Sequence, residues 1–264
     1  MNLKLENKTA LVTGSTAGIG YAIARYLAKE GASVIINGRK QEDLVDTMEQ
    51  MRQETGNEDI NGIAADFSKK QDVDKLLKAI PDVDILINNV GIFNQVDFAD
   101  ITDEQWFEMF EVNVMSGVRL ARHYFPKMME KNEGRIIFIS SESGLNIPTE
   151  MVHYGMSKTA QLSISRGLAR LTKGSNVTVN SVLPGPTWSR ANKKALEQQA
   201  EDEGKSVDEV IKDFFEHRRP TSLTQRFADV DEVASMVAYI ASPLSSSTNG
   251  AALRVDGGVV NSIE

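Results

Sequence analysis

Short apolar runs alternate along the chain with longer segments in which apolar residues recur every three or four positions. The runs that predict buried strands are 8–13 (KTALVT), 33–37 (SVIIN), 60–65, 83–88 (VDILIN), 135–140 (RIIFIS), 177–183 (VTVNSVL) and 252–255. The segments between them, such as 103–131, 151–173 and 231–240, have the spacing of amphipathic helices. Alternating strands and helices indicate βαβ units. We therefore predict an α/β fold with a three-layer, doubly wound parallel sheet, as a single domain over residues 1–264.

The segment 186–225 interrupts this rhythm and is rich in charged residues. Ser206 and Glu209 have the spacing of a capping box, which predicts the start of a short helix. The apolar side of that helix would carry Val210, Ile211, Phe214 and Phe215. An insertion of this length after the carboxyl end of a strand indicates a lid. The alternative is a surface excursion without a function.

Composition excludes several classes of protein. The 264 residues are 41% hydrophobic and 25% charged, with a net charge of −8 that disfavours nucleic-acid and anionic-membrane partners. The absence of cysteine excludes disulfides and thiolate zinc sites, and the three histidines lack paired ligand spacing, so we expect no metal site. No run of 18 apolar residues and no apolar leader is present. We expect a soluble, cytoplasmic protein.

A glycine-rich loop, Gly14-Ser15-Thr16-Ala17-Gly18-Ile19-Gly20, follows the first predicted strand and leads into a helix. The free N–H groups and positive dipole end of such a helix suit a pyrophosphate. Gly14 can make the tight turn, and Gly18 and Gly20 permit close approach of backbone and helix. The alternative is a strand–helix turn that binds no ligand. The P-loop pattern is absent, which disfavours an NTPase.

Tyr154 and Lys158 are four residues apart, so they share one face of a predicted helix. A phenol titrates near pH ~10, and a nearby ammonium group favours the phenolate, which would make Tyr154 an acid/base at neutral pH. Ser141 lies thirteen residues upstream, after an apolar run that can deliver its hydroxyl to the same place. Taken alone the pair is a weak motif, because a half-buried tyrosine beside a solvated lysine has the same spacing. Tyr21 and Arg25 show a similar spacing elsewhere in the chain.

The motifs in order resemble those of the short-chain dehydrogenase/reductase family. They are Thr13-Gly-x-x-x-Gly18-Ile19-Gly20, Asp66, Asn88-Asn89-x-Gly91, Asn113, Ser141, Tyr154-x-x-x-Lys158 and Pro184-Gly185. The resemblance covers nearly the whole chain, and only the segment 186–225 lies outside it. The tail 249–258 resembles the 3-oxoacyl-thioester reductase branch. Val90 departs from the pattern, which commonly has alanine there.

The resemblance implies a Rossmann-type sheet of about seven strands and hydride transfer at a nicotinamide. It implies that Tyr154 exchanges a proton with the carbonyl/alcohol pair and that Lys158 lowers the Tyr154 pKa and holds ribose hydroxyls. Ser141 would hydrogen-bond the substrate oxygen. Asn113 would hold a helix kink and a water that relay the proton.

Cofactor contacts are expected from the glycine loop, from the end of the second strand and from family motifs. They are Gly14, Ser15, Thr16, Gly18, Ile19, Gly20, Arg39, Asp66, Phe67, Asn88, Gly91, Tyr154, Lys158, Pro184, Gly185 and Thr187. An acidic residue at the end of the second strand would repel a 2′-phosphate, but Asn37-Gly38-Arg39 stands there, and its guanidinium suits a phosphate. We therefore predict NADP(H) in preference to NAD(H). The alternative is a turn with a solvated Arg39.

The expected substrate is a small carbonyl or alcohol, with 3-oxoacyl thioesters favoured and sugar, polyol, diketone or steroid substrates left open. Trp188, Phe214 and Phe215 in the lid favour a partly apolar ligand, unless they pack the lid itself. Arg218 and Arg219 can meet an anionic group or can simply be solvated. A catalytically silent nucleotide-binding scaffold is the alternative from another class. The resemblance also implies a homotetramer.

Overall fold

The computed structural model describes residues 2–263, apart from the side chain of Ala191. Within this range seven strands form one parallel sheet, in the order β3-β2-β1-β4-β5-β6-β7. Their bounds are β1 (Thr9–Val12), β2 (Ser33–Gly38), β3 (Ile60–Ala64), β4 (Ile85–Asn88), β5 (Gly134–Ile139), β6 (Val177–Pro184) and β7 (Ala252–Val255). Strand order reverses between β1 and β4, which is where such sheets bind ligands.

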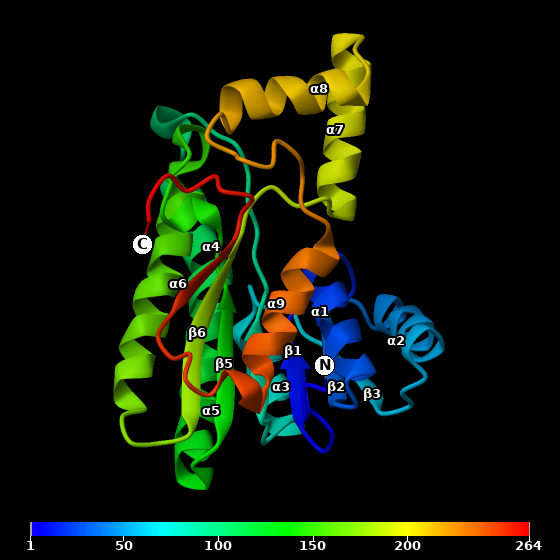
Figure 1. Ribbon diagram of the computed structural model, residues 1–264, viewed down its shortest axis with the longest axis vertical. Helices are drawn as coiled ribbons and strands as arrows, with labels where there is room; N and C mark the ends of the chain where they lie inside the picture. The colour runs from blue at the N-terminus through cyan, green and yellow to red at the C-terminus, as the bar shows by residue number, and fades with distance from the viewer. Residues whose placement is uncertain (1, 264) are drawn as a thin grey trace.

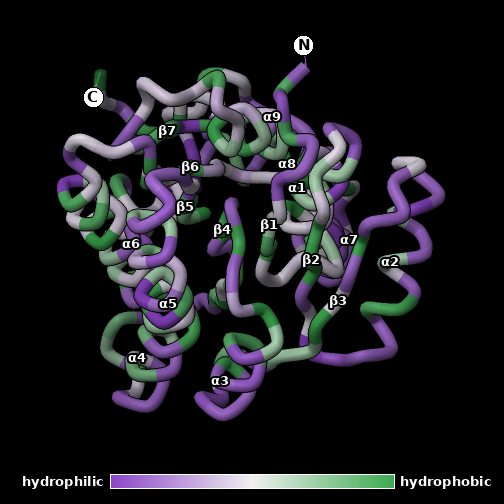
Figure 2. The backbone as a smooth tube through the Cα atoms, turned by 90° about the horizontal axis from the view of Figure 1, so that it is seen from below, coloured by the Kyte–Doolittle hydropathy of each residue, from purple (hydrophilic) through white to green (hydrophobic). Residues whose placement is uncertain are grey.

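Helices cover both faces of the sheet, as Figure 2 shows. The buried side chains of α1 (Gly18–Lys29), α2 (Gln41–Thr55) and α9 (Val230–Ala241) form a core on one face. Those of α3 (Lys70–Ala79), α5 (Ser116–Lys131) and α6 (Val152–Leu171) form a core on the other. The predicted three-layer, doubly wound α/β fold is therefore confirmed, since the central strands are buried between two apolar helix layers.

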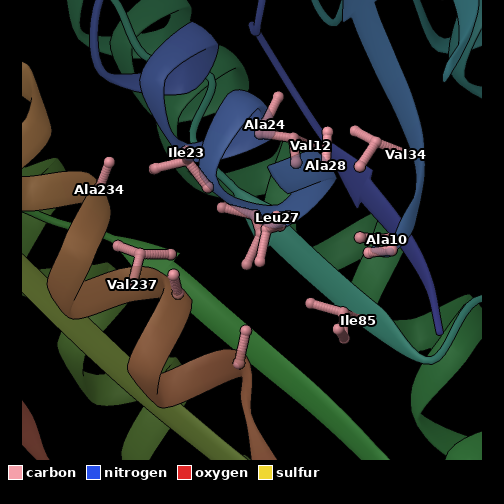
Figure 3. Close-up of a cluster of buried hydrophobic side chains, with 14 of the residues drawn as sticks. Ala10, Val12, Ile23, Ala24, Leu27, Ala28, Val34, Ile85, Ala234 and Val237 are labelled. Carbon is pink, nitrogen blue, oxygen red and sulfur yellow. The ribbon is translucent and has the colours of Figure 1, made fainter. Parts of the chain in front are cut away.

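The packing of α1 against α9 anchors the start of the glycine-rich loop (Figure 3). Ile23 and Leu27 of α1 lie in one buried cluster with Val237 of α9 and with Val12, the last residue of β1. All four side chains are fully buried. Because these positions recur every three or four residues in the helices, a continuous apolar stripe faces the sheet.

The segment predicted as one long helix over 103–131 contains three parts. They are α4 (Asp103–Phe110), a π-helical turn at Glu111–Met115, and α5. The wider turn places Asn113 at its centre. Such π-bulges in helices often mark functional sites, because they re-aim one backbone carbonyl and one side chain.

Segment 186–225 stands beyond the carboxyl ends of the strands, at the top of Figure 1. It contains α7 (Arg190–Glu203), α8 (Val207–Asp213) and a π-helical turn, η5 (Phe214–Arg218). The capping box predicted at Ser206 and Glu209 is present at the start of α8. Helix α7 was not predicted, because its sequence is mostly polar and charged and has only a short apolar stripe. Among the described residues, no helix has the length and apolarity needed to cross a bilayer.

Candidate active site

Three neighbouring hollows lie along the carboxyl edge of the sheet. The glycine-loop groove is lined by residues that include Gly14, Thr16, Ala17, Arg39, Asp66, Phe67, Asn89 and Gly91. The central cleft is lined by residues that include Ile19, Asn89, Gly91, Ser141, Tyr154, Lys158, Pro184, Gly185 and Thr187. The outer pocket is lined by residues that include Phe93, Ser141, Glu142, Glu150, Tyr154, Phe214, Arg218 and Arg219. Shared lining residues make the three hollows continuous.

The glycine loop is shaped by its own backbone. Gly14 and Gly18 have φ angles of 61° and 59°, which favour glycine. A Cβ atom on Gly20 would lie 2.4 Å from the carbonyl oxygen of Gly14, so the first turn of α1 packs directly on the loop. Ala17 occupies the N-cap of α1, where no side chain caps the helix. The N-terminal N–H groups of α1 are therefore available to an anion.

Ser15 and Asn37 both hold the glycine loop in place, but only Asn37 also lines the groove. Ser15 is fully buried, and its Oγ donates to the carbonyl of Val12 at 2.7 Å and accepts from the N–H of Asn37 at 2.9 Å. The Asn37 side chain accepts from the N–H of Gly14 at 3.1 Å and donates to the carbonyl of Ile63 at 3.0 Å. Asn37 therefore ties the ends of β1, β2 and β3 together, a role that the sequence analysis missed.

Arg39 and Asp66 lie on the outer wall of the glycine-loop groove, with Phe67 beside them. The Asp66 carboxylate accepts from the hydroxyl of Ser68 at 2.7 Å and from its N–H at 3.0 Å. The hydrogen bond from the Ser68 hydroxyl is the main reason why the pKa of Asp66 is lowered. Burial opposes this shift, while the N–H of Ser68 and the charges of Lys69 and Arg39 add to it. Phe67 is buried in the core below.

Asn88 was predicted to line the cofactor cleft, but the structure places it beneath the surface. It is 4% exposed, and neither amide atom of its side chain has a hydrogen-bond partner within the described residues. Neighbouring side chains of a strand point to opposite faces, so Asn88 points towards Gly117 of α5. Asn89 lines the groove instead, and its amide donates to the carbonyls of Thr13 and Gly14 at 2.9 and 3.0 Å.

Ser141, Tyr154 and Lys158 meet in the central cleft. Strand β5 ends at Ile139 and delivers Ser141, which is 9% exposed and hydrogen-bonds the Tyr154 phenol. The Lys158 ammonium lies 5.5 Å from the centre of the Tyr154 ring and donates to the carbonyl of Ile139 at 3.0 Å. The spacing argument for these three residues therefore predicted their convergence correctly.

Asn113 lies behind this cluster and is fully buried. Its side chain accepts from the N–H of Ile92 at 2.7 Å and donates to the hydroxyl of Ser157 at 3.0 Å. Its carbonyl, re-aimed by the π turn, accepts from the Gln161 amide at 2.6 Å. A Cβ on Gly91 would lie 3.3 Å from Lys158 Nζ and 3.5 Å from Asn113 Oδ1, so the absence of a side chain at Gly91 leaves room beside these two polar groups.

Burial dominates the electrostatics of the central cleft. It raises the pKa of the Tyr154 phenol to about 12, which the Ser141 hydrogen bond opposes and the Glu142 carboxylate reinforces. It lowers the pKa of the Lys158 ammonium to about 8. The predicted lowering of the Tyr154 pKa by Lys158 was therefore wrong for the net shift, because desolvation of the phenolate outweighs the charges around it.

The outer pocket contains residues whose role the sequence analysis missed or left open. Glu142 is 3% exposed, and its carboxylate accepts from the Arg219 guanidinium at 2.9 Å. Arg219 is therefore buried and paired, whereas Arg218 is exposed and lines the pocket. The signal in the sequence was a glutamate directly after Ser141 in a stretch, 136–157, that contains no lysine or arginine to pair with it.

The lid aromatic residues mainly pack against one another. Trp188 lies 5.4 Å from Phe227 between ring centres, and Phe215 is 1% exposed. Phe214 stacks on Phe227 at 5.1 Å and also lines the outer pocket. Of the three aromatic residues predicted to meet a ligand or pack the lid, only Phe214 both packs within the aromatic cluster and lines the outer pocket.

Comparisons with known proteins agree with this geometry. A family model described as short chain dehydrogenase matches residues 8–200. The uncharacterized oxidoreductase YvrD of Bacillus subtilis (strain 168) is 49% identical over 266 residues, covering 100% of both chains. The 3-oxoacyl-(acyl-carrier-protein) reductase FabG of Vibrio cholerae serotype O1 is 31% identical over 265 residues, covering 97% of this chain and 99% of that one.

Among solved structures, L-sorbose reductase from Gluconobacter frateurii, complexed with NADPH and L-sorbose, superposes with a TM-score of 0.92. It is 27% identical, and the match covers 100% of both chains. The family model spans well over half of the chain, and the glycine loop, Ser141, Tyr154 and Lys158 occupy one continuous cleft. This chain therefore belongs to the short-chain dehydrogenase family of oxidoreductases.

Proposed function

We propose that the protein is an NADP(H)-dependent carbonyl reductase or alcohol dehydrogenase in which Tyr154 exchanges a proton with the substrate oxygen. The observation that carries this proposal is the meeting of Ser141 and Tyr154 where the central cleft opens into the outer pocket. A substrate oxygen can approach both hydroxyl groups from the pocket, while the cleft behind them continues towards the glycine loop. This arrangement separates a substrate side from a cofactor side.

The residues along the groove and cleft fit a nicotinamide dinucleotide. The uncapped N-terminus of α1 and the close-packed glycines would hold the pyrophosphate, and Arg39 would hold a 2′-phosphate. Asp66 and Phe67 would lie near the adenine, and Pro184, Gly185 and Thr187 near the nicotinamide. The preference for NADP(H) rests on Arg39, because β2 ends in Asn37-Gly38 without a carboxylate. When bound, the nicotinamide supplies or accepts the hydride.

The side chains in the cleft then control the proton. In the reducing direction the Tyr154 hydroxyl donates its proton to the substrate oxygen, and a positioned acid of this kind contributes ~10²–10⁴-fold to rate. The Ser141 hydroxyl donates a hydrogen bond to the same oxygen as charge develops on it. Lys158, whose pKa of about 8 keeps it largely protonated at neutral pH, stabilises the phenolate that remains. Asn113 holds the π turn that supports the relay of the proton to solvent.

Two substrate classes are supported by separate observations. The 3-oxoacyl thioesters are supported by the resemblance of the C-terminal tail and by the similarity to FabG. Hydroxylated ketones such as keto-sugars are supported by the full-length similarity to L-sorbose reductase and by the polar side chains Gln95, Asn192 and Gln199 in the outer pocket. In both cases we propose that the segment 186–225 is a lid within a single domain, because α7 and η5 form one wall of that pocket.

We further propose that the protein is a homotetramer that uses α4, α5 and α6 as its interface. Large apolar side chains exposed on or beside α4 support this, notably Phe98 at 65% and Phe107 at 72% exposure. Light scattering during size-exclusion chromatography would measure about four times the mass of the chain. A monomer mass at micromolar concentration would contradict the proposal.

The experiment that tests the function follows NADPH oxidation by absorbance with 3-oxoacyl thioesters, keto-sugars, diketones and ketosteroids. NADH and the variant Tyr154→Phe serve as controls. We expect turnover of at least one class, and a loss of ~10²–10⁴-fold in the variant. Turnover that survives Tyr154→Phe would contradict the proposed mechanism. Tight NADPH binding without turnover of any class would favour a nucleotide-binding scaffold.

A further inference from the structure

Two glutamates stand at the two ends of the loop between Ser141 and Tyr154. Glu142 follows Ser141 directly, and Glu150 lies four residues before Tyr154. The guanidinium of Arg219 reaches both of them. Its Nε lies 2.9 Å from Glu142 Oε1, and its Nη1 lies 3.6 Å from Glu150 Oε1. The pair with Glu142 is shielded from solvent, since the two side chains are 9% and 4% exposed.

Arg219 is itself held firmly in the lid. Its N–H donates to the carbonyl of Phe214 at 3.1 Å, and its Nη1 donates to the carbonyl of Arg218 at 2.8 Å. The guanidinium lies 5.8 Å from the centre of the Phe214 ring, which stacks on Phe227. The cation therefore projects from the packed aromatic cluster of the lid and not from a free surface loop.

We propose that Arg219 is a positioning residue that bridges Glu142 and Glu150 and so makes the placement of Ser141 and Tyr154 depend on the docked lid. The inference rests on the proposed function, because Ser141 and Tyr154 are the groups that would touch substrate. A charge-assisted, buried contact to one end of the loop and a second contact to the other end restrict the loop at both attachment points. When the lid is displaced, both restraints are lost together.

The Glu142–Arg219 ion pair also influences the pKa of the Tyr154 phenol. The titratable groups facing Tyr154 are Glu142 and Arg219 from the outer pocket and Lys158 from its own helix. The Glu142 carboxylate raises the pKa of Tyr154, and Arg219 lowers it. Burial raises the pKa of Glu142 as well, and Asp256 adds to that shift while Arg219 opposes it. Removing one member of the pair therefore leaves the other uncompensated.

Opposite shifts of the pH profile provide the test. In alcohol oxidation the rate rises with pH as Tyr154 loses its proton. We expect Arg219→Met to move this rise to higher pH, because at alkaline pH the unpaired Glu142 is ionised beside the phenol. We expect Glu142→Gln to move it to lower pH, and the double variant to lie between the two. If the ion pair only stabilised the fold, removing Arg219 and removing Glu142 would not shift the pH profile in opposite directions.

The value of kcat gives a second readout, because it depends on how the reacting groups are positioned. Displacing a reacting group by 1 Å can cost about 10²-fold in rate, so we expect kcat to fall about 10- to 100-fold in Arg219→Met. Arg219→Lys keeps the charge but loses the fork that spans both glutamates, so it should restore the pH profile more fully than kcat. The matched control is Arg226→Met, since Arg226 lies in the same part of the chain and pairs with exposed Glu232. We expect no change in that variant.

Amide hydrogen exchange tests the loop without turnover. We expect the amides of residues 142–151 to exchange at least 5-fold faster in Arg219→Met and in Glu142→Gln than in the unmodified protein or in Arg226→Met. Unchanged exchange together with unshifted profiles would overturn the inference, as would shifts of both partners in the same direction. If Arg219→Met does not fold, Glu142→Gln alone must show the shift to lower pH and the faster exchange.

The proposed function and this inference fail in different ways. If the activity does not depend on Tyr154, the proposed function fails, and the exchange measurement still reports on the bridge. If the activity depends on Tyr154 but Arg219→Met matches the unmodified protein in kcat, profile and exchange, only the bridge is refuted.

Discussion

The glycine-loop groove and the outer pocket lie at the same edge of the sheet but are held together by different forces. Backbone contacts and small residues shape the groove, as when Gly20 packs directly on Gly14 and Asn37 ties three strand ends together. Side chains from distant parts of the chain shape the pocket. There, Arg219 of the lid pairs with Glu142, and Phe214 stacks on Phe227.

Because of this difference, we expect the groove and the outer pocket to respond differently to mutation. A groove made from the ends of buried strands has little freedom, because β1 and β2 are each fixed by a ladder of hydrogen bonds on both sides. A pocket closed by a segment with its own small core, formed by Leu196, Ala200 and Val210, can open without disturbing the sheet. We therefore expect cofactor binding to tolerate mutations in α8 and η5 of the lid and substrate turnover to be sensitive to them.

After Tyr154→Phe, the largest expected effect concerns the point where the two regions meet. Replacing Ser141 with Ala removes a hydroxyl that would stabilise the developing charge on the substrate oxygen. We expect kcat to fall about 10²–10³-fold, the range found for loss of one such donor. Steady-state kinetics would measure this, and fluorescence titration should show unchanged affinity for NADPH. An unchanged kcat would remove Ser141 from the proposed mechanism.

A substitution in the groove should affect folding. A Cβ atom on Gly20 would lie 2.4 Å from the carbonyl oxygen of Gly14 and 2.5 Å from the Asn89 amide nitrogen. We expect Gly20→Ala to lower the free energy of unfolding by about 1–3 kcal/mol, measured by urea denaturation.

The matched control for this substitution is Gly167→Ala in α6. A Cβ at Gly167 meets no heavy atom within 4 Å, so the helix should gain up to about 1 kcal/mol. Equal effects of the two substitutions would contradict the view that close packing shapes the groove.

Cofactor preference is expected to change when the outer wall of the groove changes. Arg39→Asp exchanges a phosphate-binding cation for a carboxylate. A charged hydrogen bond contributes about 1.5–3 kcal/mol, so the ratio of kcat/KM with NADPH to that with NADH should fall about 10- to 100-fold. Lys40→Asp makes the same change of charge one residue away, outside the groove lining, and should leave the ratio nearly unchanged. A small ratio in the unmodified protein, unaffected by Arg39→Asp, would contradict the predicted preference for NADP(H).

The smallest expected effect lies in the lid. Ser206→Ala removes the N-cap of α8, which costs about 1 kcal/mol for a cap of this kind. Because α8 can open locally, the amides of α8 should exchange about 5-fold faster while the midpoint of global unfolding stays nearly constant. Helix α9 keeps its own capping box at Asp229 and serves as the internal control. A large change in global stability would show that lid and sheet unfold together.

Most of the sheet could be predicted from the sequence. Each strand is a short apolar run, and the helices α1, α3 and α9 carry periodic apolar residues, so the local pattern and the tertiary burial agree for these helices and for the central strands β1, β4, β5 and β6. Helix α7 escaped prediction because its sequence is mostly polar and charged, and its short stripe of Leu196 and Ala200 packs in a small separate cluster with residues of α8, Trp188 and Phe227. The π turn at Asn113 was not visible in the hydrophobic pattern, and only the family resemblance implied a helix kink there.

The sequence by itself determined most of the residues of the cleft, because strand ends in a parallel sheet lie at one edge and a four-residue spacing in a helix gives one face. Only the tertiary structure decided the electrostatics and the pocket. Burial turned the expected lowering of the Tyr154 pKa into a rise to about 12. The tertiary fold also pairs Arg219 with Glu142, which lies 77 residues away along the chain. Desolvation and long-range pairing depend on which surfaces become covered, and a local pattern does not contain that information.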